Sequence, residues 1–371
     1  MKIVADENMP DLDLFRRAGR VVMVPGRDLG ARQVADAEVL LVRSVTRVDA
    51  ALLAGSDVRW VGSATIGTDH LDLQWLAGAG IKVANAPGCN AAAVSEYVLQ
   101  AALEWARGQE RLLGACQVGI VGLGNVGRRT AALMQALGAR VLVSDPPREA
   151  RGELPEYGAW APLSAVLDCD LVSLHVPLVT DGLWPTWHLL SGQTLAQMGA
   201  GQCLVNTSRG AVIDNHALLT RLAAPQPPAT VLDVWENEPT PMPGLVQAVG
   251  RATPHIAGYS VEGKRRGTAM LWQQFCAWRG MLADVETVTA PAGEAGQGVN
   301  SEADLLALLR QRYDIREDDR SLRATLASTD AGAAFDALRR DHGPRHECSG
   351  LQLAGRAGPG FAEVLERLGV R

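Results

Sequence analysis

The stretch QVGIVGLGNVG occupies residues 117–127, and a helical pattern follows it from Arg128 to Leu137. Its first five residues have the composition of a buried strand, and Gly122, Gly124 and Gly127 follow at once. A second apolar run, Arg140–Ser144, ends at Asp145, 18 residues after Gly127. Strand, glycine turn, helix, strand and acid in this order predict a dinucleotide-binding unit built on a parallel α/β sheet.

The glycine turn indicates which dinucleotide the unit would bind. Glycines permit a tight turn, so that a pyrophosphate can approach the backbone N–H groups of Asn125 and Val126 at the helix N-terminus. Asp145 can accept hydrogen bonds from ribose hydroxyls and would repel a 2′-phosphate, so NAD is expected as cofactor. Arg148 leaves NADP as a minor alternative, and a glycine turn without any ligand is the purely structural interpretation.

Composition excludes several classes of protein. The chain has 371 residues, and at about 150 residues per domain this length suggests two or three domains. Its net charge of −6 is spread over interspersed acidic and basic residues, so neither a nucleic acid nor a membrane surface is an expected partner. Six scattered cysteines show no metal-ligand spacing, and residues 1–7 lack the apolar core of a signal peptide. We expect a cytoplasmic protein without a metal site.

Short apolar runs alternate with helical patterns along most of the chain, which is typical of parallel sheets covered on both faces. The expected strands are 3–5, 21–24, 39–42, 60–62, 81–83, 117–121, 140–144, 170–175, 202–206 and 229–233. A long helix is expected over 91–107, a linker over 289–300, and helices over 301–312, 330–340 and 361–368. The fold class is therefore α/β, with two doubly wound, Rossmann-like domains, an active site in the cleft, and a small C-terminal α+β domain.

We place the domain boundaries where these patterns change. Residues 1–94 together with 258–286 form the first domain, 95–257 the dinucleotide-binding domain and 287–371 the C-terminal domain.

Three segments in the second half of the chain each place a charged or titratable side chain just beyond an apolar run. They read TSRG at 207–210, DVWENEP at 233–239 and TPHIAGY at 253–259. Arg209 can hold a carboxylate through two parallel hydrogen bonds, and His255 can accept and return a proton near neutral pH. A neighbouring carboxylate would orient the imidazole, and the sequence leaves Glu236 and Glu238 nearly even for that part. Such groups beside a dinucleotide predict oxidation of a 2-hydroxy acid.

Polar and apolar residues at the predicted strand ends should line the cofactor crevice, because ligands of open α/β sheets bind beyond the carboxyl ends of strands. Val176, Asn206, Thr207 and Asp233 are the candidates. His175 also ends a strand, although core packing is the favoured interpretation of this histidine.

On these segments the chain resembles the D-2-hydroxyacid dehydrogenase family over residues 1 to about 286. The resemblance implies that Arg209 binds the substrate carboxylate, that Glu238 supports the histidine, and that His255 is the general acid and base. It further implies a set of contact residues: Ser44, Thr65 and Tyr259 for the substrate, and Asp145, Val176, Asp233 and Gly258 for NAD. Valine at position 176 departs from the family pattern and allows only backbone or apolar contact there.

Further segments are similar to the branch of this family that acts on a phosphorylated four-carbon acid. They are DENMP at 6–10, RSVT at 43–46, ANAPGCN at 84–90, DPPR at 145–148, HIAGYSVEGKRRG at 255–267, YDIREDD at 313–319 and FDALR at 335–339. The implied reaction is oxidation of the 2-hydroxyl of 4-phospho-D-erythronate, within pyridoxal 5′-phosphate biosynthesis. The similarity also implies a homodimer formed through the C-terminal domain.

A substrate with two anionic ends needs a second cation beyond Arg209. Arg43 is the first candidate for the phosphate end, and Lys264, Arg265 or an arginine of a partner subunit are its rivals. Two other functions stay open. One is oxidation of a different acid, such as glycerate or 3-phosphoglycerate, with a regulatory C-terminal domain. The other is an NAD-sensing scaffold that binds proteins.

Overall fold

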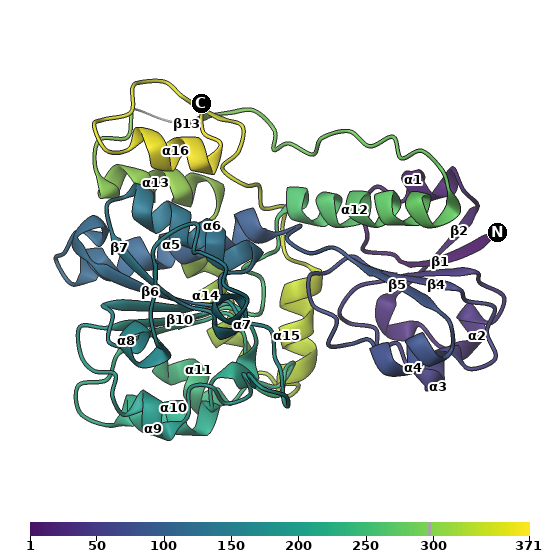
Figure 1. Cartoon of the computed structure of the whole chain (residues 1–371), viewed down its shortest axis with the longest axis horizontal. Helices are drawn as coiled ribbons and strands as arrows, with labels where there is room; N and C mark the ends of the chain where they lie inside the picture. Colours follow the sequence, from purple (N-terminus) through teal and green to yellow (C-terminus); the bar gives the residue numbers. More distant parts are fainter. Residues whose placement is uncertain (296–297) are drawn as a thin grey trace. The chain divides into compact units, whose positions relative to one another are not determined.

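The computed structural model describes residues 1–295 and 298–371; Gly296 and Gln297, inside the expected linker, lie outside the described residues. The chain forms two compact units (Figure 1). The first comprises Met1–Asn90 and Ser260–Thr289, and the second comprises Ala91–Tyr259 and Ala290–Arg371. The unit boundaries lie within a few residues of the expected boundaries around residues 94, 258 and 286.

The first unit is built on a parallel sheet of five strands in the order β2-β1-β3-β4-β5. The bounds are β1 Lys2–Asp6, β2 Arg20–Val24, β3 Val39–Val42, β4 Trp60–Ser63 and β5 Lys82–Asn85. All four residues of β3 are buried, as expected for a parallel strand covered on both faces.

Two sets of helices bury the faces of this sheet. Phe15 of α1 (Asp13–Arg16) and Trp272 and Phe275 of α12 (Val261–Arg279) share one apolar core with β1 and β3. The core of the opposite face contains residues of α2 (Ala31–Val34), α3 (Ala50–Leu53) and α4 (Leu73–Gly78). The unit is therefore a complete α/β layer structure, and α12 closes it although its residues are distant in sequence from the rest.

The second unit contains a parallel sheet of seven strands in the order β12-β11-β10-β9-β6-β7-β8. The bounds are β6 Gln117–Val121, β7 Arg140–Ser144, β8 Ala159–Trp160, β9 Leu171–Leu174, β10 Cys203–Asn206, β11 Ala229–Leu232 and β12 Arg251–Ala252. The strand order reverses between β6 and β9, which makes their carboxyl ends the switch point where ligands of such sheets bind.

Helices cover both faces of this second sheet (Figure 1). On one face lie α5 (Ala91–Gly108) and α6 (Asn125–Ala136), and on the other α8 (Leu163–Leu167), α9 (Gly192–Leu195), α10 (Asn215–Ala223) and α11 (Pro243–Ala248). The short helix α7 (Pro146–Ala150) follows β7 directly. The expected doubly wound parallel sheets are confirmed.

The C-terminal residues form the expected extra α+β part of the chain, and they pack into the second compact unit. The reason is a shared core: Leu305 and Leu309 are buried in the same apolar cluster as Leu99 and Leu103 of α5. The C-terminal elements are α13 (Glu302–Arg312), α14 (Ile315–Thr325), α15 (Ala331–Arg340) and α16 (Ala362–Leu368) with the strands β13 (Gly293–Ala295) and β14 (Leu351–Leu353).

The expectation of a linker without strands over 289–300 is wrong, because β13 lies inside this range and pairs in parallel with β14. Among the described residues, none of the helices has the length and apolar character needed to cross a membrane. All six cysteines are buried, and none forms a disulfide bond with another.

Candidate active site

The glycine turn after β6 has the geometry of a dinucleotide site. Gly122 has a φ of +90°, and a Cβ atom on it would lie 2.7 Å from the carbonyl oxygen of His175. A Cβ atom on Gly127 would lie 1.9 Å from the carbonyl oxygen of Gly122, so neither position accepts a side chain. At Gly124 a Cβ atom would meet no described atom within 4 Å. The turn is therefore tightly packed on its protein side and open at Gly124.

The helix N-terminus above this turn can receive an anion. Helix α6 begins at Asn125, three residues before the expected start, so that Asn125 and Val126 lie in its first turn. No side chain of the described residues caps the helix at Gly124. No capping side chain in the described part of the chain satisfies its first N–H groups, and we expect the pyrophosphate of NAD to accept from them.

Asp145 lies beside the same turn. One carboxylate oxygen accepts from Leu123 N at 2.8 Å and the other from Arg148 N at 3.2 Å. Each oxygen has a further lone pair for a ribose hydroxyl. Arg148, the residue that could have favoured NADP, pairs with Glu153 through Nε and Oε2 at 2.5 Å and donates to the Leu123 carbonyl. These bonds occupy the Arg148 guanidinium and so make it less available for a 2′-phosphate, which favours NAD over NADP.

Residues that follow the neighbouring strands are the expected wall of the cofactor crevice, and their contact with NAD stays a prediction. Val176 follows β9, and its Cγ1 would lie 2.8 Å from a Cβ atom on Gly122. Thr207 has a buried hydroxyl with no hydrogen-bond partner among the described residues, so it can bond to a cofactor. Asn206 is 1% exposed and bonds to Arg209 O and Ser208 N, which assigns its amide to holding the following loop.

His175 is a structural residue of this crevice. Its Nε2 lies 3.0 Å from Ser173 Oγ, and its backbone N donates to Val121 O. Desolvation lowers the pKa of His175 to about 3, so the ring is neutral at physiological pH. The favoured interpretation as a packing residue agrees with these contacts.

The three segments with Arg209, Glu238 and His255 follow the carboxyl ends of β10, β11 and β12, which are adjacent in the sheet. Gly210 brings the first two loops into contact, because a Cβ atom on it would lie 1.9 Å from the carbonyl carbon of Trp235. Arg209 also donates from Nη1 to Ser208 O at 2.7 Å. The sheet thus places these loops at one edge.

His255 and Glu238 form a hydrogen-bonded pair. Nδ1 of His255 lies 2.7 Å from Oε2 of Glu238, whose other oxygen accepts from Trp235 N at 2.9 Å. Burial alone would raise the pKa of Glu238, but the adjacent His255 ring, followed by Arg339, holds it below its usual value. The imidazole side chain is 32% exposed, so its Nε2 is the atom that can meet a substrate.

Asp233 fixes the backbone around this histidine. Its carboxylate accepts from Thr253 Oγ1 at 2.6 Å, Ile256 N at 2.8 Å and Ala257 N at 2.9 Å. His255 itself has a φ of +56°, a left-handed conformation that costs on the order of 1 kcal/mol or more for a residue with a side chain. Asp233 therefore holds a strained turn, and its expected contact with NAD stays a prediction, as does that of the half-buried Gly258.

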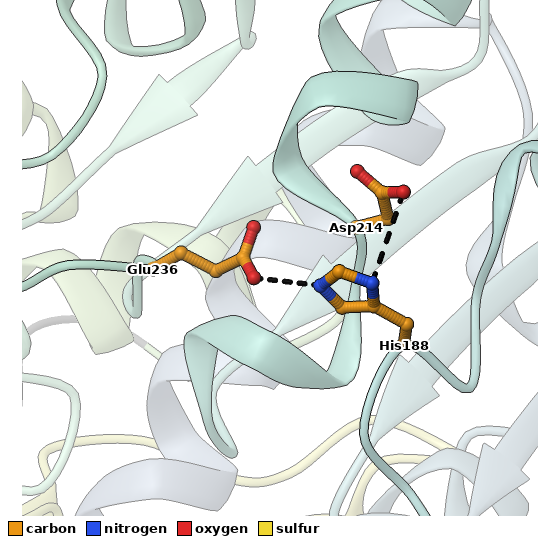
Figure 2. A group of neighbouring side chains, drawn as sticks. All are labelled: His188, Asp214 and Glu236. Carbon is orange, nitrogen blue, oxygen red and sulfur yellow. Dashed lines mark hydrogen bonds and ion pairs between the residues drawn. The ribbon is translucent and has the colours of Figure 1, made fainter.

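Glu236, the other acid considered for His255, has a different partner. Figure 2 shows its carboxylate bonded to His188, whose opposite ring nitrogen faces Asp214. The Glu236–His188 distance is 2.7 Å, and the His188–Asp214 distance is 3.8 Å. The three side chains bring potential metal-ligand atoms within 4.8 Å of one another. However, Glu236 also accepts from Asn215 N and Asp214 from Ala217 N, so we assign this cluster to tying two loops to α10.

The remaining candidates lie in the first unit. Arg43 and Ser44 follow β3, and Thr65 follows the neighbouring β4. Thr65 Oγ1 lies 2.7 Å from Ser63 Oγ and 3.0 Å from Gly67 O. Burial, and then the charge of Arg43, lower the pKa of Lys264 on α12 to about 8, which places these two cations near each other.

Arg265, another rival for the phosphate end, is bonded to Asp11 at 2.7 Å. The candidates are thus distributed over the two units, with Arg209, Glu238, His255 and Tyr259 in the second. Sequence reasoning missed Arg339, which acts on Glu238 and lies over the Tyr259 ring. Its only signal was the FDALR segment at 335–339.

Comparison with known proteins identifies the family. The profile of the D-isomer specific 2-hydroxyacid dehydrogenase NAD binding domain matches residues 91–257, and a domain of unknown function, DUF3410, matches residues 288–369. An erythronate-4-phosphate dehydrogenase of Pseudomonas aeruginosa is 46% identical over 100% of both chains. The chain belongs to the erythronate-4-phosphate dehydrogenase family.

Another member of the erythronate-4-phosphate dehydrogenase family, from Marinobacter nauticus, is 47% identical over 95% of this chain and 94% of its own. The solved D-lactate dehydrogenase of Aquifex aeolicus, complexed with NAD and lactic acid, shares the fold with a TM-score of 0.62. It is 20% identical and covers 76% of this chain and 96% of its own. As a member of the erythronate-4-phosphate dehydrogenase family, the chain is an NAD-dependent dehydrogenase, and the resemblance found in the sequence is confirmed.

Proposed function

We propose that the chain oxidises the 2-hydroxyl of 4-phospho-D-erythronate to (R)-3-hydroxy-2-oxo-4-phosphooxybutanoate with NAD, in pyridoxal 5′-phosphate biosynthesis. The observation that carries the proposal is the His255–Glu238 pair at 2.7 Å, at the carboxyl edge of the nucleotide-binding sheet. It occurs in a chain 46% identical over its whole length to a dehydrogenase named for this acid.

Each residue has a defined part in this proposal. Arg209 holds the substrate carboxylate through two charge-assisted hydrogen bonds and so fixes the neighbouring C2 atom. Glu238 accepts from Nδ1–H of His255, which leaves Nε2 to take the proton of the 2-hydroxyl as C2 becomes a carbonyl carbon. Bound NAD supplies the acceptor for the hydride that leaves C2. In the reverse direction, His255 returns the same proton.

The phosphate end requires separate binding groups. Arg43, with Lys264 near it, supplies two cations from the first unit, and this supports our assignment of the phosphate to them. Ser44, Thr65 and Tyr259 complete the proposed substrate contacts. The preference for a phosphorylated acid would then depend on residues other than Arg209 and His255.

We also propose a cytoplasmic homodimer assembled through the C-terminal residues. No disulfide bond joins any two of the six cysteines, which supports a reducing compartment. The resemblance of segments 313–319 and 335–339 to the C-terminal dimerisation domain supports the dimer. Light scattering of the purified full chain, giving the mass of one or two chains, tests the assembly.

The substrate is tested by the rate of NAD reduction with 4-phospho-D-erythronate and with erythronate, under identical conditions. The proposal predicts a much larger kcat/KM for the phosphorylated acid. Equal values for the two acids, or a higher value for glycerate or 3-phosphoglycerate, would contradict it. A chain that binds NAD but oxidises none of these acids would favour the scaffold function.

A further inference from the structure

We propose that Arg339, on the C-terminal helix α15, is a positioning residue of its own chain's active site, holding Tyr259 and Glu238 for catalysis. The inference rests on the proposed function for the roles of Glu238, His255 and Tyr259. It gives the C-terminal residues a part in the reaction that is additional to any part in assembly.

Helix α15 packs directly against the loop that contains Glu238. Phe335 is 0% exposed and lies in the same apolar cluster as Trp235. At Gly332 a Cβ atom would lie 3.1 Å from Thr240 Cγ2 and 3.6 Å from Pro239 Cγ. The helix is therefore held next to the residues that follow Glu238, and its last turn projects Arg339 toward the site.

Arg339 contacts Tyr259, the proposed substrate-binding tyrosine. Its Cζ atom lies 5.7 Å from the centre of the Tyr259 ring, within the range of a cation–π interaction. The contact ties the Tyr259 ring to α15.

The charge of Arg339 also acts on the carboxylate behind the histidine. Burial by itself lowers the pKa of Arg339, whereas Tyr259 and Glu238 raise it. In return, Arg339 helps His255 to keep the pKa of Glu238 low against the effect of burial. An ionised Glu238 accepts from Nδ1–H of His255 and leaves Nε2 for the substrate, so the guanidinium supports the proton transfer without touching the substrate.

Two further C-terminal residues contact the turn that contains His255 and Tyr259. His342 lies edge-on to the Tyr259 ring, with ring centres 6.0 Å apart. Arg345 donates from Nη1 to Ala257 O at 2.8 Å and lies over the Tyr313 ring at 3.9 Å. The turn from His255 to Tyr259 is thus braced by residues that follow the nucleotide-binding fold in sequence.

One donor of Arg339 is still unused. Its Nε is buried with no hydrogen-bond partner among the described residues. Arg310, Arg312 and Arg345 share this feature, so the role assigned to Arg339 follows from its contact with Tyr259 and its charge near Glu238.

The test uses the full-length protein with Arg339→Met and Arg339→Lys, and Arg340→Met as a matched control. Arg340 is the next residue of the same helix, is exposed, and pairs with Asp341. We expect Arg339→Met to lower kcat about 100-fold with melting temperature and NAD affinity close to wild type. Lysine keeps the charge and should restore part of the rate, and Arg340→Met should behave as wild type.

Wild-type kcat in Arg339→Met would overturn the proposal. A rise confined to the KM of the phosphorylated acid would also overturn it, because Arg339 would then be a phosphate ligand. If Arg339→Met does not fold, Arg339→Lys decides: a lowered kcat at the wild-type melting temperature supports the proposal, and an unchanged kcat contradicts it. The wild type is measured first with each acid, so a wrong substrate assignment is recognised independently of Arg339.

Discussion

Two acids that are two positions apart in the sequence have different partners in the fold. Glu238 bonds to His255, whereas Glu236 bonds to His188 and to Asn215 N. The segment DVWENEP alone could not separate them, because both carboxylates follow the same strand. Glu236 instead bonds to His188, a residue of another loop, and no local sequence pattern connects positions 188 and 236.

The first prediction compares these two acids. Glu238→Gln should lower kcat by roughly 100-fold or more, because a neutral amide orients His255 less well and does not stabilise its charged form. Glu236→Gln should keep kcat near wild type and lower stability by about 1 kcal/mol through the weaker bond to His188. Steady-state kinetics and thermal melting of both variants give the comparison. A larger loss of kcat in Glu236→Gln would show that the acids were assigned the wrong way round.

A second prediction at this scale concerns Lys264. Burial, and then Arg43, lower its pKa to about 8, so the ammonium becomes neutral as the pH rises through that value. The KM for 4-phospho-D-erythronate should therefore increase above about pH 8, because a neutral amine no longer attracts the phosphate. Erythronate is the control, and Lys264→Met should remove the difference. The same pH dependence of KM for both acids would argue against a phosphate contact at Lys264.

At the scale of elements, the turn between β6 and α6 contains one glycine that the packing of the fold requires and another that is expected to approach NAD. In Gly127→Ala the new Cβ would overlap the Gly122 carbonyl, at 1.9 Å, whereas in Gly124→Ala it meets no described atom within 4 Å. We expect Gly127→Ala to lose several degrees of melting temperature, and Gly124→Ala to melt like wild type but bind NAD more weakly. Fluorescence titration with NAD and a melting curve measure both effects. Wild-type NAD affinity in Gly124→Ala would mean that this face of the turn does not approach the cofactor.

Most strands were predictable because each is an apolar run bounded by polar or turn residues; β3 has the expected bounds of Val39–Val42. Two-residue strands such as β8 and β12 are too short to show a period. The sequence around β13 predicts a linker because glycine and alanine dominate it. The pairing of β13 with β14 depends on a segment that is distant in the sequence. The sequence pattern predicts too late a start for α6, because the first turn of this helix lies within the glycine motif.

At the scale of the whole molecule, the C-terminal residues share their interior with α5. Glu96 of α5 is 5% exposed and accepts from Cys348 N at 3.0 Å. Arg129 of α6 donates to Arg367 O at 2.9 Å. A Gly- and Ala-rich stretch marks where the C-terminal part begins, but the sequence alone could not show which distant apolar faces meet.

The same region predicts how stability depends on pH. Burial, followed by the charge of Glu347, raises the pKa of Glu96 from its ordinary 4.5 to about 7. Between these values the folded chain binds more protons than the unfolded chain, so this group stabilises below about pH 4.5 and its contribution is lost as the pH rises to about 7. Glu96→Gln should remove that decline and be more stable than wild type at pH 8, by at most about 3 kcal/mol.

Urea unfolding at about pH 5 and pH 8 measures this difference. Glu366→Gln on α16 is the matched control, because this glutamate is exposed. A wild-type protein whose stability rises between the two pH values, with no effect of Glu96→Gln on the slope, would contradict the expected role of the buried carboxyl group.

The central claim is that one guanidinium and one imidazole at the edge of the second sheet act on a substrate that NAD oxidises. The most direct measurement is turnover with 4-phospho-D-erythronate, together with NAD affinity, in Arg209→Ala and His255→Ala. The account predicts that both variants bind NAD like wild type and lose turnover by about 100-fold to 10,000-fold. Turnover close to wild type in either variant, or an equal loss of NAD affinity in both, would contradict it.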